Sequence, residues 1–321
     1  MLDGHVLVDA HVHLPVLSTL SSSWIDWARQ FGPDGVLERA WDGEGIPRPA
    51  AVDELFAEQG VDIAILFCEY SPKATGMQLF DDLLPVVEHN PARFRPMANV
   101  NPHLHHPIGD EVRRQLGHGA AGLKLHPVHG GFTCDDPMLY PAYQVLVEEG
   151  APLVVHCGTS TFAGSSNQYA DPSHLLAVTR DFPELDIVLA HGGRGWWYEQ
   201  AAFMAMSNPR VWIELSGLPP KRLPQYYAAA GLERLAKKMI FATDWPGVPG
   251  ADVTPAPSRT WCPRQTSLRS SGATPFVSTV DWRCSEVAVY ALGELTPHIP
   301  DSVFIHPDAV VIGAVTLGEQ A

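Results

Sequence analysis

Histidine, which can bind metal ions and transfer protons, occurs 15 times in this sequence. Two of the histidines form the motif His11-Val-His13 near the amino terminus. In a β-strand alternate side chains point to the same face. We therefore expect the two imidazoles to converge on one side, with Ala10 and Val12 facing outward. A lone H-x-H motif leaves metal binding and coincidence equally open.

Three further candidates each end an apolar run: His156 in PLVVHCGTS, His191 in IVLAHGG and Asp244 in MIFATDWP. In a barrel of parallel strands, the carboxyl ends of the strands meet at the rim that carries the active site. Burying these polar groups costs several kcal/mol unless they are satisfied, and one divalent ion would satisfy them together. The sequence favours a metal site over a purely structural set of buried polar groups.

Eight short apolar runs alternate with helical patterns, an order typical of a parallel sheet wrapped by helices. The runs are His5–Leu14, Val61–Tyr70, Phe94–Asn101, Ala121–Val128, Pro152–Thr159, Asp186–Gly193, Val211–Gly217 and Lys238–Pro246. The expected helices are Val52–Gln59, Met77–His89, Met138–Glu149, Pro172–Asp181, Trp197–Ser207 and Pro224–Lys237. This pattern predicts an α/β fold, a (β/α)8 barrel of the TIM type. The aromatic-rich insertion from Pro15 to Pro49 should lie at the catalytic rim.

Residues 1–250 resemble the amidohydrolase superfamily, in particular its amidohydrolase-related branch, which includes aminocarboxymuconate semialdehyde decarboxylase, resorcylate decarboxylase and pyrone dicarboxylate lactonase. The motifs that carry the resemblance are D-A-H-V-H (9–13), G-L-K-L-H-P (122–127), V-V-H-C (154–157), A-H-G-G (190–193) and T-D-W-P (243–246).

The resemblance implies catalytic and metal-binding roles for five residues. His11, His13, His156 and Asp244 would hold one divalent metal ion, with zinc the favoured ion. His191 would be the unligated acid or base, and Asp244 could also accept a proton from a bound water. Three neutral nitrogens and one carboxylate would leave the ion enough positive charge to activate that water.

Two cations are candidates for binding a substrate carboxylate. Arg194 follows His191-Gly-Gly directly, and its guanidinium can bind a carboxylate through two hydrogen bonds. Lys124 has three alternatives: a carboxylate clamp, a structural ion pair with Asp9 or Asp244, or the carbamylated bridging lysine of other superfamily branches.

The sequence pattern changes after Gly250. Residues 251–288 show no period and do not encode the eighth helix of the barrel, so we expect an irregular linker, which could be translated out of frame. In residues 289–321, Ile299, Ile305, Val311 and Leu317 recur every six positions. This stretch resembles the start of a γ-class carbonic anhydrase-like hexapeptide protein and predicts a short, truncated left-handed β-helix. It contains none of that family's metal histidines.

The net charge of −15 argues against nucleic acid and anionic membranes as partners. Five cysteines without a C-x-x-C motif argue against a disulfide framework, and the amino terminus carries no secretory signal, so we expect a cytoplasmic protein. A homo-oligomer is also allowed. The resulting hypothesis is a metal-dependent hydrolase or nonoxidative decarboxylase acting on a small carboxylated or cyclic metabolite. The alternative is a degenerate, catalytically impaired barrel fused to a hexapeptide assembly segment.

Overall fold

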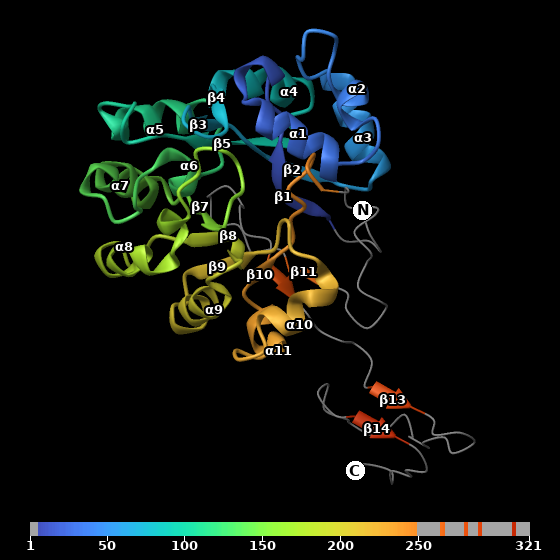
Figure 1. Cartoon of the computed structure of the whole chain (residues 1–321). Coiled ribbons are helices and arrows are strands. Elements are labelled where there is room, and N and C mark those ends of the chain that lie inside the picture. Colours follow the sequence, from blue (N-terminus) through green and yellow to red (C-terminus); the bar gives the residue numbers. More distant parts are fainter. Residues whose placement is uncertain (1–5, 249–263, 267–278, 282–287, 291–309, 313–321) are drawn as a thin grey trace. The chain divides into compact units, whose positions relative to one another are not determined.

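The computed structural model describes residues 6–248 and four short strands beyond them, at 264–266, 279–281, 288–290 and 310–312. Eight parallel strands form one sheet, each beside the next in sequence (Figure 1). They are β1 (Val8–His13), β2 (Ile63–Phe67), β5 (Phe94–Asn99), β6 (Leu123–Leu125), β7 (Leu153–Gly158), β8 (Ile187–Arg194), β9 (Val211–Glu214) and β10 (Met239–Ile240).

The sheet curls into a nearly closed barrel because the segment after β10 returns to β1. The His13 N–H donates to the Trp245 carbonyl at 2.8 Å, and the Asp244 N–H donates to the His11 carbonyl at 3.0 Å. The predicted TIM-type barrel is thus confirmed, and all eight predicted strands belong to it. The same hydrogen bonds bring the first and last strand ends together, which matters for the site below.

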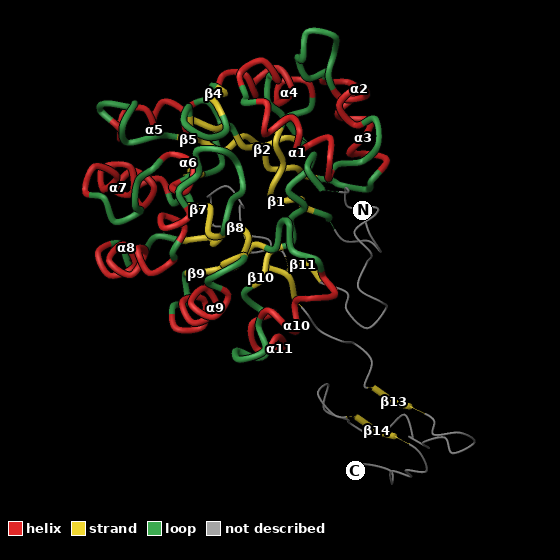
Figure 2. Tube along the Cα trace, viewed as in Figure 1, coloured by secondary structure: helices red, strands yellow, loops and turns green. Residues whose placement is uncertain are grey.

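Helices surround the strands, which Figure 2 shows as yellow segments inside a ring of red ones. They are α1 (Ser22–Phe31), α2 (Val36–Ala40), α3 (Pro49–Glu58), α4 (Leu84–His89), α5 (Ile108–Gly117), α6 (Pro127–Gly130), α7 (Tyr140–Glu149), α8 (Leu175–Asp181), α9 (Tyr198–Ser207), α10 (Leu223–Tyr226) and α11 (Leu232–Ala236). Two short antiparallel strands, β3 (Glu69–Ser71) and β4 (Gly76–Gln78), extend the connection after β2. Among the described helices, none has the length and apolar character needed to span a membrane.

Two helix predictions need correction, and several helices were missed. The expected helix Met77–His89 begins later, with a 3-10 helix at Phe80–Leu83 that continues into α4, because Met77 pairs with Tyr70 in the β3–β4 hairpin. The expected helix Pro224–Lys237 is divided into α10 and α11, and Gly231 between them has a positive φ of 78° that interrupts an α-helix. Helices α1, α2, α5 and α6 were not predicted.

The side chains of strand β1 do not alternate regularly between the two faces of the sheet, so the direction expected for one of them is wrong. Its register with β2 shifts between Asp9 and Val12, which marks a β-bulge or irregularity. Val12 packs outward against the helices as expected. Ala10, expected to face outward, instead packs against an apolar cluster to which only strands contribute. That cluster comprises Ile65, Phe67, Met97, Val154, Val188, Ala190 and Ile240.

Most of the carboxy-terminal predictions fall outside the described residues. These are the missing eighth helix, the irregular linker 251–288 and the hexapeptide segment 289–321. Within them the structure describes β11 (Arg264–Thr266) beside β12 (Thr279–Asp281), and β13 (Ala288–Tyr290) pairing in parallel with β14 (Val310–Ile312). The domain boundaries therefore remain predictions.

Candidate metal centre

A cavity of about 300 Å³ lies at the carboxyl ends of the strands. Its lining residues are His13, Trp24, Trp27, Phe31, Glu69, His126, His129, His156, Thr159, Ser160, Thr161, Phe162, His191, Arg194 and Asp244. Three of the aromatic side chains come from α1, so the Pro15–Pro49 insertion does contribute to the rim, as the sequence predicts. The cavity lining thus combines aromatic side chains with several histidines.

His11, His13 and Asp244 form a compact cluster of metal-ligand atoms. His11 Nε2 lies 3.0 Å from His13 Nε2, and Asp244 Oδ1 lies 3.4 and 3.5 Å from these two nitrogens. Four ligands at about 2.1 Å from a tetrahedral ion stand about 3.4 Å apart. The spacing of the three atoms therefore fits one divalent ion, with nitrogen and oxygen donors of the kind that zinc accepts.

The backbone at two site residues adopts a conformation that side chains rarely favour. Asp244 has φ 79° and His191 has φ 63°, and both are non-glycine residues. Such a backbone costs of order 1–3 kcal/mol and persists only where the surroundings enforce it. At Asp244 the enforcement comes from Asp9, whose carboxylate accepts hydrogen bonds from the Thr243 N–H at 2.9 Å and the Thr243 hydroxyl at 2.6 Å.

Glu214 on β9 orients the imidazole of His11. His11 Nδ1 lies 2.7 Å from Glu214 Oε2, and both side chains are 1 % exposed. Burial raises the pKa of Glu214 to about 7; above that pH its ionised carboxylate can only accept, so Nδ1 carries the proton and Nε2 keeps the lone pair that points into the cluster. The other oxygen of Glu214 accepts from the Ser216 N–H.

Burial and neighbouring charges determine the protonation of the cluster. Burial lowers the pKa of His11, His156 and His191 well below the usual value, so these imidazoles are neutral and can donate lone pairs. Burial alone would raise the pKa of Asp244, but the adjacent His11 and His13 hold that pKa below its usual range. His11 therefore presents a neutral imidazole beside the ionised carboxylate of Asp244.

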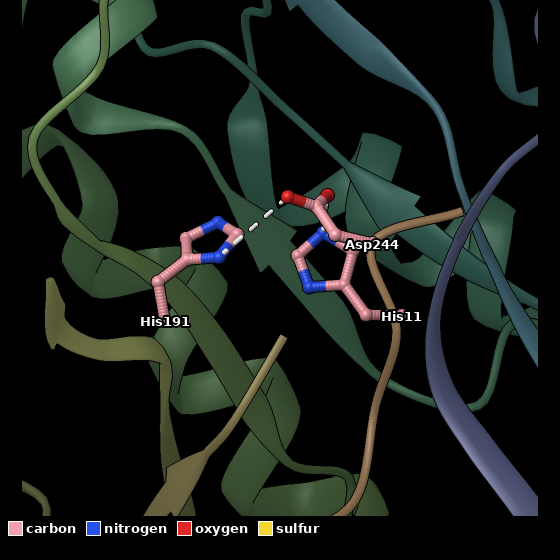
Figure 3. Close-up of side chains that lie close together, drawn as sticks. All are labelled: His11, His191 and Asp244. Atoms are coloured by element: carbon pink, nitrogen blue, oxygen red, sulfur yellow. Dashed lines mark ion pairs between the residues drawn. The ribbon is translucent and has the colours of Figure 1, made fainter. Parts of the chain in front are cut away.

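His191 lies against the same cluster from the end of β8. Figure 3 shows its imidazole beside Asp244 and His11, with 3.9 Å between His191 Nδ1 and Asp244 Oδ2. The three residues have ligand-type atoms that all lie within 4.8 Å of one another. His191 Nδ1 is also 3.1 Å from the Ser216 carbonyl oxygen, which can only accept. Nδ1 therefore carries a proton, and Nε2 is the basic nitrogen of this residue.

Arg194 also reaches the cluster. Its Nη1 lies 3.8 Å from Asp244 Oδ2, and its Nη2 donates to the Thr159 carbonyl at 3.3 Å. Gly217 makes room for this approach, because a Cβ at that position would stand 2.5 Å from Arg194 Nη1. The guanidinium thus lies on the cavity wall beside Asp244.

Two predicted residues lie outside the cluster. His156 lines the cavity, but its Nε2 lies 3.1 Å from the Gly158 carbonyl oxygen, to which it must donate. Lys124 is fully buried and does not line the cavity. Among the described residues its Nζ has no hydrogen-bond partner; it lies 4.3 Å above the Phe67 ring, and burial lowers its pKa to about 8.

Sequence reasoning did not identify a second polar set in the cavity, formed by Glu69, His129 and Ser160. His129 Nδ1 is 2.5 Å from Glu69 Oε1, and His129 Nε2 is 3.0 Å from Ser160 Oγ. The available signal was the H-P-V-H spacing of His126 and His129 at the end of the predicted strand Ala121–Val128. Glu69 and Ser160 carry no comparable signal: Glu69 begins the short strand β3, two residues after β2, and Ser160 lies two residues after β7.

The fold and the site together define a TIM barrel with a histidine-rich cavity at the carboxyl ends of its strands. The family model described as Amidohydrolase matches residues 8–268, so the chain belongs to the amidohydrolase family. That match continues past Gly250, the boundary expected from the sequence. A search among curated proteins gave no match.

Solved structures of low sequence identity share the fold. An uncharacterised TIM-barrel protein from Bordetella bronchiseptica is 22 % identical, with a TM-score of 0.60, over 77 % of this chain and 89 % of that one. The 5-carboxyvanillate decarboxylase of Sphingomonas paucimobilis is 17 % identical, with a TM-score of 0.52, over 78 % and 91 %.

The corresponding decarboxylase of Novosphingobium aromaticivorans, complexed with manganese and 4-hydroxy-3-methoxy-5-nitrobenzoic acid, is 18 % identical, with a TM-score of 0.54, over 78 % and 89 %. At these identities the likeness supports the barrel and not a substrate. The comparisons lend no support to the degenerate-barrel alternative.

Proposed function

We propose that this protein is a metal-dependent hydrolase or nonoxidative decarboxylase acting on a small carboxylated or cyclic metabolite. The observation that carries the proposal is the cluster of His11, His13 and Asp244, whose ligand atoms are 3.0–3.5 Å apart beside a cavity of about 300 Å³. A cavity of this volume suits a single small ring or a short-chain acid.

One divalent ion would be held by His11, His13 and Asp244, with His156 as the fourth ligand and zinc the favoured ion. His156 would ligate through Nδ1, or through Nε2 after releasing the Gly158 carbonyl. The ion would polarise the substrate or lower the pKa of a bound water. Glu214 holds His11 in the tautomer this arrangement needs.

The remaining roles fall to residues of the chain that face the cavity. Arg194 binds the substrate carboxylate through its guanidinium, and the aromatic side chains of Trp24, Trp27 and Phe162 exclude water around the ring. His191 takes or gives a proton at Nε2, because its Nδ1 is engaged with Ser216. Asp244 is the second proton acceptor.

Lys124 acts on this site through its charge. Its buried amine lies among the carboxylates of Glu214, Asp244 and Glu69, whose negative charges raise its pKa while burial lowers it. It stays the weaker of the two proposed carboxylate partners, because it lies behind the cavity wall.

The test combines metal analysis with two assays. We expect purified protein to carry about one divalent ion per chain. The metal-loaded protein would then release carbon dioxide from 5-carboxyvanillate or open the ring of a pyrone dicarboxylate. Asp244→Asn should lose both metal and turnover, whereas Asp186→Asn, on the surface before β8, should keep both. A protein that binds no divalent ion would contradict the proposal.

A further inference from the structure

Glu69, His129 and Ser160 meet in the cavity from three separate segments. Glu69 is on β3, His129 is on α6, and Ser160 follows β7; helix α6 packs against both of these strands (Figure 1). All three side chains line the cavity, yet the residues are only 3, 4 and 8 % exposed. None of them belongs to the His11–His13–Asp244 cluster.

The hydrogen bonds among Glu69, His129 and Ser160 can form a single donor chain, from the serine hydroxyl through the imidazole to the carboxylate. Glu69 Oε1 lies 2.5 Å from His129 Nδ1, and an ionised carboxylate can only accept, so Nδ1 carries the proton. In the neutral imidazole, Nε2 is then the acceptor. Ser160 Oγ lies 3.0 Å from it and donates its hydroxyl proton. The order carboxylate, imidazole, hydroxyl is that of an acyl-transfer triad, in which the acid holds Nδ1 and the nucleophile contacts Nε2.

The loop around Ser160 fixes the position of its side chain. The Phe162 N–H donates to Ser160 Oγ at 3.3 Å, and the Ser165 hydroxyl lies 3.1 Å from the same atom. The Ser160 N–H donates to Asn167 Oδ1 at 2.7 Å, which fixes the loop conformation. These contacts hold the serine in place beside His129 Nε2.

We propose that Glu69, His129 and Ser160 form a second, metal-independent acyl-transfer centre that cleaves small esters or lactones in the same cavity. Ser160 Oγ bonds to the carbonyl carbon while its proton passes to His129 Nε2. The bond from the carbonyl carbon to the leaving oxygen breaks, and that oxygen takes the proton from His129. Water then cleaves the ester on Ser160, giving one proton through His129 back to Ser160 Oγ, and the acid departs.

This centre goes beyond the proposed metal-dependent function, because no step uses a ligand of the ion. The two functions can therefore fail separately. Removal of metal should abolish the metal-dependent reaction and leave the serine reactive. Phe162 and Trp27, whose ring centroids are 5.7 Å apart, form an apolar wall beside Ser160 that favours a small acyl group.

Covalent labelling of the full-length protein tests the proposal directly. Diisopropyl fluorophosphate phosphorylates an activated serine with loss of fluoride, and peptide mass spectrometry locates the adduct. We expect modification of Ser160 at the same rate before and after treatment with EDTA. An unmodified protein, or one modified only at other residues, would overturn the proposal.

Hydrolysis of p-nitrophenyl acetate by the EDTA-treated protein provides the second readout. Ser160→Ala and His129→Gln should each lower the rate at least ~100-fold, and Glu69→Gln should lower it by a smaller factor. Ser173→Ala, an exposed serine before α8, should leave the rate unchanged. Ser160→Ala removes a single oxygen, so it decides the matter even where a change at His129 impairs folding. Equal rates for Ser160→Ala and the parent would refute the triad.

Discussion

Replacing Glu214 tests whether a residue that never touches the ion determines the affinity for it. In Glu214 both oxygens accept, one from His11 Nδ1 at 2.7 Å and the other from the Ser216 N–H. A glutamine has one oxygen and one NH2 group, so Glu214→Gln leaves one of these two donors facing another donor. His11 then loses its charged partner and its fixed orientation.

The expected cost follows from this contact. Loss of a carboxylate behind a metal-ligating histidine weakens metal binding about 10- to 100-fold, which corresponds to about 1.4–2.7 kcal/mol. Because both side chains are 1 % exposed, water cannot replace the lost bond, and we expect the upper half of this range. Competition against a chromophoric zinc chelator measures the dissociation constant. Glu233→Gln, exposed on α11, is the matched control.

The result that would refute the reasoning is equally specific. If Glu214→Gln binds zinc within twofold of the parent and circular dichroism shows an intact fold, His11 is not a ligand oriented by Glu214. The ion would then belong elsewhere in the cavity, and the proposed ligand set would have to be abandoned.

Three further predictions concern the same site. His191→Gln should abolish turnover yet keep the metal, whereas His156→Gln should lose the metal. If metal analysis shows instead that His191→Gln loses the ion and His156→Gln keeps it, His191 is the ligand. Gly217→Ala should raise the KM for a carboxylated substrate and also lower kcat, because its Cβ would stand 2.5 Å from Arg194 Nη1 and 3.2 Å from Asp244 Oδ2; an unchanged KM would contradict this. In metal-free protein burial raises the pKa of Asp9 from 3.8 to about 7, corresponding to roughly 4 kcal/mol. The folded state then binds more protons than the unfolded state, so stability should fall as pH rises through this interval, and urea unfolding of Asp9→Asn should show a flatter dependence.

Periodicity predicted the barrel because strands and helices have different repeat lengths, and each apolar run is a local feature. The same reasoning placed His156, His191 and Asp244 at strand ends, which meet in any parallel barrel. It failed where the local pattern was misleading: the bulge in β1 places Ala10 on the inner side, and Gly231 divides an apparently continuous helix.

By itself, then, the sequence determined the barrel, the positions of its strands and the residue types gathered at their carboxyl ends. Only the tertiary structure decided which of them touch. His11 meets Glu214 across 203 residues, and Glu69 meets His129 across 60, so no local pattern links either pair. The tertiary structure also decided which cation faces the cavity: Arg194 lines it, whereas Lys124 is buried and does not. Side-chain contacts between distant strand ends depend on register and barrel closure, which are properties of the whole sheet.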